Sequence, residues 1–365
     1  MCDKKKVLHV VGHLGKGGDS TAILNVMNYI EENQINIQFD FLTHNGYDEK
    51  LVDALKRKDV NVIVFDGDVR IIGPIKYYRL LVKFFKNNNY DAVHFHTSFQ
   101  SIIGIIAAKR SGISVRICHS HTSDTVRKVN RFEKMIILPI CRLLINFFST
   151  KRVCCSRNAG IFLFGRNSSF EVLYNGIDIT SIKKTDKIKI DKICKKYEIR
   201  KDDIIIGQVG RFDENKNQMF TINMAGYFLK KNSKVKFFLL GSGETFGTLK
   251  KYVKEKHLNN IFFTDVVSDV NNYMCLFDYL LLPSKFGEGL PVTLIEQQIV
   301  NSNCVCLVSD IVTREANLGN VKYIKLDDMD EWIKIIENEL YNGKKCDYSK
   351  FDINNTAEKW LDVYK

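Results

Sequence analysis

The stretch of sequence that decides the fold is Tyr279-Leu280-Leu281-Leu282-Pro283, which is followed closely by Phe286-Gly287-Glu288-Gly289-Leu290-Pro291. The apolar run predicts a buried strand, and the glycine-rich turn leads into a helix that opens at Pro291. A strand, turn and helix of this kind aim free backbone N–H groups and the positive end of the helix dipole at the carboxyl edge of a sheet. This geometry is typical of a phosphate site.

Two glutamates flank the predicted start of this helix. Glu288 lies on the loop, and Glu296 lies about one turn into the helix. The two carboxylates therefore place hydrogen-bond acceptors for two separate sets of ligand hydroxyls at one edge of the protein, beside a site for an anion. Sugar nucleotides have this layout of hydroxyls and phosphates.

Two cations lie upstream, at the end of another predicted strand. The strand-like run Ile204–Gly210 is followed by Arg211, and Lys216 comes five positions later. Open parallel sheets bind ligands at the carboxyl ends of their strands, where an arginine and a lysine can give bidentate and point-charge contacts to a pyrophosphate. An isolated pair of this spacing is more often a solvated basic turn. In the company of Glu288 and Glu296 it favours a binding site.

Strand and helix patterns alternate along the whole chain, which indicates doubly wound parallel sheets. The first series has strands near residues 6–12, 36–43, 60–66, 90–96, 114–118, 152–155 and 171–174, and the second series begins near residue 203. A chain of 365 residues exceeds what one core usually supports. We therefore predict an α/β protein with two domains, residues 1–178 and 179–349, joined by the polar, lysine-rich segment that runs to about residue 200.

Four of the eight histidines fall at the ends of two successive predicted strands, namely His94, His96, His119 and His121. Strand ends in this fold class face the ligand. A structural role is the simpler interpretation for His94 and His119.

Several motifs, taken in order and spacing, resemble those of the retaining glycosyltransferases of family 4, and more narrowly the branch found in capsular and exopolysaccharide clusters. The motifs are Gly15-Lys16-Gly17-Gly18, His119-Ser120-His121-Thr122, Cys155-Ser156-Arg157-Asn158-Ala159-Gly160, Asn175-Gly176-Ile177-Asp178, Gly210-Arg211 with Lys216-Asn217, Gly241-Ser242-Gly243-Glu244, and Glu288 with Glu296.

The resemblance implies the GT-B architecture, in which two Rossmann-like doubly wound domains face a central cleft. The first domain would bind the acceptor, the second would bind the nucleotide sugar, and a last helix at about residues 350–365 would pack back on the first domain. The implied reaction moves a hexose or N-acetylhexosamine from a UDP-sugar to a glycan acceptor, which we expect to be lipid-linked.

The resemblance also implies roles for particular residues. Arg211, Lys216 and the helix start at Gly287–Pro291 would neutralise the departing diphosphate, Glu296 would hold the ribose, and Glu288 would orient the sugar. His121 would lie against the transferred sugar, with His96 and His119 as secondary candidates. The remaining expected donor-binding positions are Gly15, Gly17, Gly18, Gly243, Val266, Gly287, Gly289 and Leu290.

The chain departs from the family pattern at three places. Asp19 precedes Ser20, so an acidic group that usually follows the double glycine and one spacer is displaced or lost. Compared with the commonest form of the family motif, Gly287 is one additional residue between Pro283 and Glu288. Asp265 stands where a glycine is common near the nucleobase.

No cofactor and no metal ion are expected. Asp66-Gly67-Asp68 spells a metal-binding pattern of another glycosyltransferase architecture, but it ends a strand of the first domain, far in sequence from the donor motifs. The ten cysteines show no paired C-x-x-C groups, so a zinc site is not indicated either.

The net charge of +12 is concentrated in the first half of the chain, where residues 1–180 hold 25 Lys and Arg against 16 Asp and Glu. Nine cations lie near the apolar run Met135–Phe148, and they are Arg127, Lys128, Arg131, Lys134, Arg142, Lys151, Arg152, Arg157 and Arg166. The run is too short to span a bilayer. It is either a buried helix with solvated basic flanks or a surface that docks on anionic lipid, and the motifs of a nucleic-acid reader are missing. With no signal-peptide pattern at the start, we expect a cytoplasmic protein that is peripheral to the membrane in the second case.

Two other functions remain open from the sequence. One is a nucleotide-sugar epimerase of the same architecture, and the other is a glycan-binding or scaffold protein without catalysis. Incubation with UDP-sugars separates the three, because an epimerase would interconvert free donors and a scaffold would neither transfer nor hydrolyse them.

Overall fold

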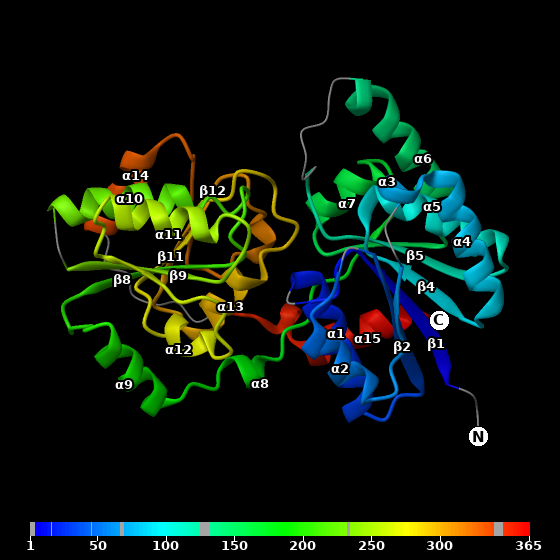
Figure 1. The fold of residues 1–365 in the computed structure, drawn as a ribbon, viewed down its shortest axis with the longest axis horizontal. Coiled ribbons are helices and arrows are strands. Elements are labelled where there is room, and N and C mark those ends of the chain that lie inside the picture. Colours follow the sequence, from blue (N-terminus) through cyan, green and yellow to red (C-terminus); the bar gives the residue numbers. More distant parts are fainter. Residues whose placement is uncertain are drawn as a thin grey trace. The chain divides into compact units, whose positions relative to one another are not determined.

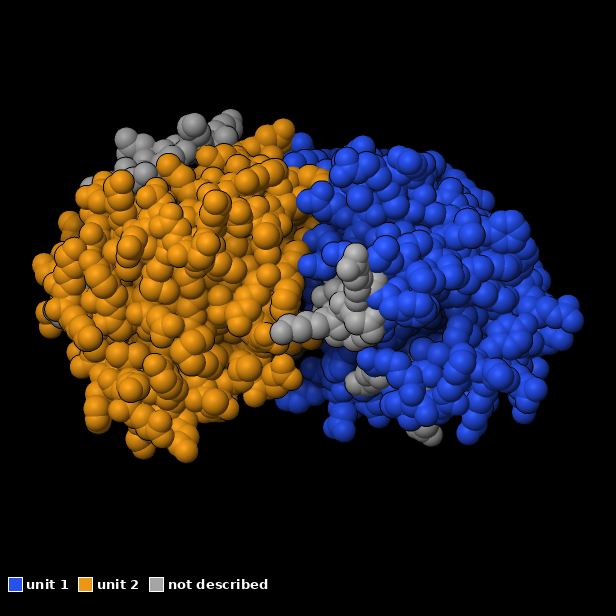
Figure 2. All heavy atoms as spheres, turned by 90° about the horizontal axis from the view of Figure 1, so that it is seen from above, with its two compact units in different colours: residues 1–178, 349–365 blue, residues 179–348 orange. Residues whose placement is uncertain are grey.

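The computed structural model describes residues 4–15, 17–44, 46–65, 69–124, 132–231, 234–338 and 346–365. The chain divides into two compact units, which Figure 2 colours separately. The first unit comprises Met1–Asp178 together with Ser349–Lys365, and the second comprises Ile179–Tyr348.

The first unit is built on a parallel sheet of seven strands in the order β3-β2-β1-β4-β5-β6-β7. The strands are β1 Lys5–Val11, β2 Ile37–Thr43, β3 Val62–Val64, β4 Ala92–Phe95, β5 Val115–Ser120, β6 Lys151–Cys154 and β7 Glu171–Val172. The helices are α1 Gly18–Glu32, α2 Glu49–Lys56, α3 Val69–Ile72, α4 Pro74–Asn87, α5 Ser101–Arg110, α6 Leu138–Phe148, α7 Arg157–Phe164 and α15 Ile353–Asp362 (Figure 1). Short 3₁₀ turns lie at Ser98–Gln100 and Ser349–Phe351, and a π-helical turn at Glu133–Ile137 runs into α6.

The second unit repeats this plan with six parallel strands in the order β10-β9-β8-β11-β12-β13. The strands are β8 Ile204–Val209, β9 Val235–Leu240, β10 Ile261–Phe263, β11 Tyr279–Leu282, β12 Val305–Ser309 and β13 Val321–Ile324. The helices are α8 Ile179–Ile182, α9 Lys187–Lys196, α10 Gln218–Lys231, α11 Phe246–Glu255, α12 Val270–Met274, α13 Val292–Val300 and α14 Met329–Asn338, with a 3₁₀ turn at Arg314–Ala316.

Both sheets therefore have the strand order of a Rossmann fold, with the direction of winding reversed between β1 and β4 and between β8 and β11. The predicted fold class, two doubly wound α/β domains, is confirmed. The strands predicted at residues 60–66 and 171–174 are shorter in the structure, where β3 and β7 are the two edges of the first sheet. Edge strands pair on one side only, and their ends are often irregular.

The last helix belongs to the core of the first unit. Trp360 and Tyr364 are fully buried and pack with Val7 of β1 and Met27 of α1 in one apolar cluster. The backbone around Ile177 pairs with the chain that enters α15, because Ile177 N–H donates to Phe351 O and Ile353 N–H donates to Ile177 O. The segment that enters α15 is thus hydrogen-bonded to the end of the segment Met1–Asp178.

Candidate functional site

In the second unit, the loop after β8 is held close to the loop after β9 by two glycines. Gly241 and Gly243 have φ angles of 130° and 159°, and a Cβ on either residue would overlap backbone atoms of Gly210 or Phe212. Phe212 N–H donates to Ser242 O at 2.9 Å. Gly243, which the sequence predicted near the donor, is needed here for the close approach of two strand ends.

Lys216 and Glu288 are brought together by this framework. Lys216 Nζ lies 2.8 Å from Glu288 Oε1, and the hydroxyl of Ser284 donates to the same oxygen at 2.7 Å. Burial acts to raise the pKa of Glu288, but the ion pair with Lys216, the hydrogen bond from Ser284 and the charge of Arg211 together lower it. Glu288 is therefore a carboxylate that already has strong partners within the protein.

Asn215 ties the two loops at the same place. Its side-chain oxygen accepts from Phe286 N–H at 2.7 Å, and its backbone oxygen accepts from Lys285 N–H at 2.9 Å. The position of Glu288 therefore depends on the chain beside Lys216 through backbone contacts as well as through the ion pair.

Arg211 lies in a different environment from Lys216. Its side chain is 79% exposed, and Arg211 Nε contacts Asp213 Oδ2 at 3.0 Å. Because Arg211 helps to lower the pKa of Glu288, its charge acts on the same site without being buried in it. The arrangement leaves the guanidinium accessible to a ligand anion.

The helix predicted after Pro291 begins at Val292, with Pro291 as its N-cap. Glu296 lies on this helix, and no hydrogen bond or ion pair joins its carboxyl to another described residue. Burial raises the pKa of Glu296 to about 7. A carboxyl with this pKa is partly protonated at neutral pH. Leu290 and Pro291, which precede the helix, are buried.

Gly287 and Gly289 flank Glu288 in the loop before this helix, as the sequence predicted. Val266 is 49% exposed in the loop after β10. The preceding Asp265 has a φ of 47°, in the left-handed region that glycine adopts most easily and that aspartate tolerates. This explains why glycine is expected at that position.

In the first unit, the loop between β1 and α1 carries Gly15, Gly17 and Gly18. Gly17 is the N-cap of α1 and Gly18 is its first residue, while Lys16 lies outside the described residues. The hydroxyl of Ser20 donates to His13 O at 3.2 Å and steadies the loop. Asp66 and Asp68 also lie outside the described residues, so the structure gives them no position.

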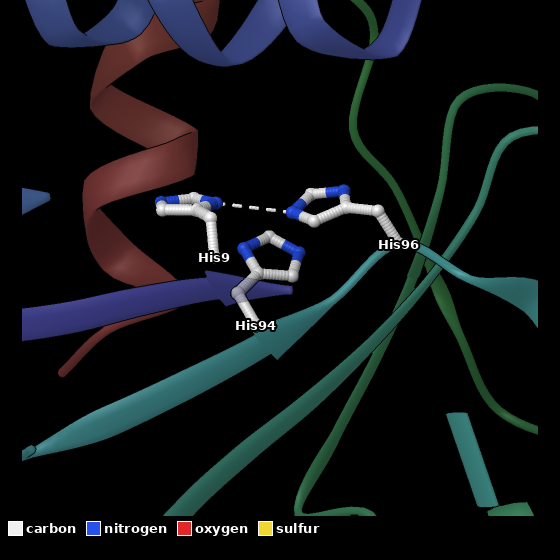
Figure 3. A group of neighbouring side chains, drawn as sticks. All are labelled: His9, His94 and His96. Carbon is white, nitrogen blue, oxygen red and sulfur yellow. Dashed lines mark hydrogen bonds between the residues drawn. The ribbon is translucent and has the colours of Figure 1, made fainter. Parts of the chain in front are cut away.

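Five imidazoles lie on one face of the first sheet, and they are His9, His94, His96, His119 and His121. Within a strand, alternate side chains point to the same side, and His9 pairs directly with His94 across β1 and β4. Figure 3 shows the rings of His9, His94 and His96 gathered above these strands. Trp360 of α15 covers the group, with its ring centroid 5.3 Å from that of His119 and 5.5 Å from that of His94.

Burial favours the neutral form of all five imidazoles. Burial lowers the pKa of His9 to about 3 and keeps the pKa values of His94, His96 and His119 well below the usual range. Burial also lowers the pKa of His121, although the nearby carboxylate of Asp19 opposes the shift. The displaced acid noted in the sequence therefore still acts on the candidate residue at the sugar.

Two triads of these rings, His9-His94-His96 and His96-His119-His121, each bring three ring nitrogens within 4.8 Å of one another. Such a set has the donor chemistry that zinc accepts. However, the nitrogens are joined in pairs by hydrogen bonds; His96, which both triads share, lies 3.0 Å from His9 on one side and 2.8 Å from His121 on the other. The residues fit an imidazole network better than a bound ion.

Two family models match the chain in succession. Residues 17–181 match the model described as Glycosyltransferase Family 4, and residues 189–346 match the model described as Glycosyl transferases group 1. The chain belongs to the family 4 glycosyltransferases.

Two relatives of this glycosyltransferase match most of its length. EpsF of Bacillus subtilis, itself only provisionally assigned as a glycosyltransferase, is 29% identical over 99% of this chain and 96% of its own. A galactosyltransferase of Escherichia coli, named for transfer from UDP-Gal to α-D-GlcNAc-diphosphoundecaprenol, is 24% identical over 81% of each chain. The crystal structure of Anabaena HepE in complex with UDP and glucose has a TM-score of 0.73 at 18% identity, and the match covers 98% of this chain and 99% of HepE. That similarity establishes the GT-B fold of the glycosyltransferase.

Sequence reasoning missed several members of the two clusters. Ser284 and Asn215 were not selected, although both contact Glu288 or its loop. His9 and Tyr364 were also missed, and only the alternation of histidines on the neighbouring strands gave a signal for His9.

Proposed function

We propose that this glycosyltransferase moves a hexose or N-acetylhexosamine from a UDP-sugar to a hydroxyl of a lipid-linked glycan, with retention of configuration, in the synthesis of a capsular or other surface polysaccharide. The observation that carries the proposal is the cluster of Lys216, Glu288 and Arg211 beside the start of α13. The names of the relatives, with UDP-Gal and a diphosphoundecaprenol acceptor in one and UDP in a complex of another, support the choice of donor and acceptor.

The second unit would bind the donor. Lys216, Arg211 and the backbone N–H groups at the start of α13 would neutralise the charge that develops on the departing diphosphate. Glu296 would accept hydrogen bonds from the ribose hydroxyls, since its carboxyl has no partner among the described residues. Glu288, held by Lys216 and Ser284, would orient the sugar hydroxyls.

The reaction would need no metal ion, because fixed cations and helix amides supply the positive charge. We favour front-face substitution over a double displacement. In this path the bond from the anomeric carbon to the diphosphate breaks, the acceptor oxygen attacks from the same face, and the leaving phosphate takes the acceptor proton. The first unit would contribute the backbone of Gly15, Gly17 and Gly18 at the phosphates and His121 at the sugar.

The test is a panel of UDP- and GDP-sugars, incubated with and without undecaprenyl-diphosphate sugars and read by mass spectrometry, with EDTA in a parallel series. We expect transfer from one UDP-sugar, slow hydrolysis without acceptor, and no loss of rate in EDTA. Interconversion of free donors would identify an epimerase. The absence of both transfer and hydrolysis would indicate a binding protein without catalysis. Loss of activity in EDTA that manganese restores would contradict the metal-independent path.

We also propose that the first unit docks on anionic lipid. Phe132, Ile136, Ile140, Leu143 and Phe147 follow one another at helical spacing from the turn before α6 to its end, and each is between 44% and 70% exposed. Lys134 lies exposed on the same segment. Exposed apolar side chains with basic neighbours are the pattern of an interfacial helix. Among the described residues no helix is both long and apolar enough to cross a bilayer.

A further inference from the structure

The buried histidines of the first unit and one tyrosine form a single unbranched series of hydrogen bonds. In order its members are His119, His94, Tyr364, His9, His96 and His121. Going along the series, His119 Nδ1 lies 3.2 Å from His94 Nε2, and His94 Nδ1 lies 2.9 Å from the Tyr364 hydroxyl. The same hydroxyl lies 3.4 Å from His9 Nε2, His9 Nδ1 lies 3.0 Å from His96 Nε2, and His96 Nδ1 lies 2.8 Å from His121 Nε2. We call this series the imidazole chain.

If the Tyr364 hydroxyl donates to one neighbouring ring and accepts from the other, the count of protons in the imidazole chain allows two orders. A neutral imidazole has one N–H and one lone pair, and a tyrosine hydroxyl can donate once and accept at the same time. Each of the five contacts therefore takes one proton, and one proton is left over at an end. The two end atoms, His119 Nε2 and His121 Nδ1, are buried and have no hydrogen-bond partner among the described residues.

In the first order, His121 donates from Nε2 to His96 and keeps a bare lone pair on Nδ1. In the second, His96 donates to Nε2 of His121, and Nδ1 of His121 carries the remaining N–H. The Asp19 carboxylate acts on His121 and has no comparable effect on His119. A negative charge near one end favours the order that puts the spare proton at that end, which is the second order.

We propose that the imidazole chain fixes His121 in the tautomer with its proton on Nδ1, and that Tyr364, at the middle of the chain, is a positioning residue for sugar transfer. This rests on the proposed function, in which His121 meets the transferred sugar. Hydrogen bonds in series polarise one another, so the terminal N–H is a stronger donor than an isolated imidazole. A donor whose direction is set in advance can hold a sugar hydroxyl without reorganising during the reaction.

A bound metal ion accounts for fewer of these contacts. An ion in either triad would take lone pairs from three rings and would break the contacts that those rings make to one another. It would also leave Tyr364, which contacts both His94 and His9, without a part in the site. The imidazole chain uses all six side chains, with four contacts of 2.8–3.2 Å and a longer one of 3.4 Å between Tyr364 and His9.

The first measurement is ¹⁵N NMR of the histidine side chains in the full-length protein at pH 7, with metal content determined on the same sample. We expect Nδ1 of His121 at the shift of a protonated nitrogen, Nε2 at that of an unprotonated one, and a scalar coupling across the hydrogen bond between His96 and His121. Averaged shifts for His121, the opposite tautomer, or one metal ion per chain with metal-shifted nitrogens would overturn the proposal.

The second measurement compares Tyr364→Phe with Tyr77→Phe. Tyr364→Phe keeps the buried ring but divides the imidazole chain at its centre. Tyr77→Phe is a matched control, since the Tyr77 hydroxyl contacts His44 at 2.6 Å in the same unit, away from the chain. We expect Tyr364→Phe to give averaged His121 shifts and about a tenfold lower kcat with unchanged UDP affinity, and Tyr77→Phe to match the wild type.

The two measurements separate the inference from the function on which it rests. A wild-type spectrum with an ordered His121, together with no sugar transfer to any acceptor, would preserve the imidazole chain and contradict the proposed function. Equal His121 shifts in Tyr364→Phe and wild type would contradict the chain, whatever the activity. The wild-type spectrum decides the point even if Tyr364→Phe does not fold.

Discussion

Lys216 Nζ and Glu288 Oε1 lie 2.8 Å apart in the second unit, and both side chains are largely buried, at 19% and 12% exposure. The two residues come from loops that follow different strands, β8 and β11. Removing one partner of such a buried ion pair lowers the stability of the fold strongly, because the other charge is left without compensation.

Lys216→Met should destabilise the second unit by about 3 kcal/mol, whereas Lys216→Met combined with Glu288→Gln should recover most of that loss. Both variants should be inactive in transfer. Urea unfolding followed in a Trp360→Phe background, where Trp332 reports on the second unit, measures the difference. Equal stability of the single and double variants would show that the pair is not coupled.

Arg211→Ala should reduce kcat by about 10²–10³ without loss of stability, since the side chain is exposed but aimed at the diphosphate in the proposed reaction. Lys230→Ala, which removes an exposed cation from α10, is the matched control. The comparison needs steady-state rates and one thermal unfolding curve for each variant. A rate for Arg211→Ala close to that of the control would remove Arg211 from the donor site.

UDP affinity should rise with pH through about 7, because burial raises the pKa of Glu296 to about 7 and ribose hydroxyls donate to its ionised form. Above that pH the affinity should level off, and below it the affinity should fall by up to about tenfold per pH unit. Calorimetric titration from pH 5.5 to 8.5 in two buffers also detects the released proton. Glu296→Gln should show a flat profile, and a flat wild-type profile would exclude this role.

The first unit should lose stability as the pH falls below about 6.5. Its buried histidines stay neutral when folded, because their pKa values are lowered, while the unfolded chain takes up protons in this range. Each such histidine removes about 1.4 kcal/mol per pH unit below its unfolded pKa. Trp332→Phe leaves Trp360, which packs on His94 and His119, as the only tryptophan and reporter.

Acid titration of Trp332→Phe should therefore give a steep transition, and Trp360→Phe should report a shallower one from the second unit. Coincident, gradual transitions in both variants would mean that the buried histidines titrate normally.

Binding to anionic vesicles should be reversible and should weaken with salt, since each basic residue near such a surface contributes about 1 kcal/mol over a Debye length of ~8 Å at physiological salt. Two variants separate charge from apolar contact. Arg127, Lys128, Arg131 and Lys134 changed together to Ser should lose the salt-dependent part, and Leu143→Ser with Phe147→Ser should lose the remainder. If either variant sediments with the vesicles as strongly as the wild type, the residues changed in it belong to a solvated face. Arg127, Lys128 and Arg131 lie outside the described residues.

Much of the fold follows from the sequence, because each strand of a parallel sheet is a short apolar run and each helix has a different period. The run Tyr279–Leu282 became β11, and the helix expected at Pro291 begins one residue later. The left-handed φ of Asp265 was also marked in advance by a departure from the expected glycine. Local geometry of this kind is encoded by neighbouring residues.

The pairing of distant side chains was not predictable in the same way. Lys216 was expected at the diphosphate and Glu288 at the sugar, and nothing in a separation of 72 positions shows that the two contact each other. In the sequence, His9 is a single polar residue in an apolar strand, and Tyr364 lies at the end of a predicted helix. Their contact depends on strand order and on where α15 returns, which only the folded sheet determines.

The return of α15 to the first unit also sets the order in which the protein can assemble during translation. The strands that carry the imidazoles are synthesised early, but Trp360 and Tyr364, which cover them, are made only after the whole of Ile179–Tyr348. Until then the face of the sheet with the histidines lacks both the covering Trp360 ring and the Tyr364 hydroxyl. The first unit therefore cannot complete its fold until the second unit has been synthesised, and the second unit can fold first. In the meantime the polar rings and apolar surface of the first unit stay accessible to solvent and to chaperones.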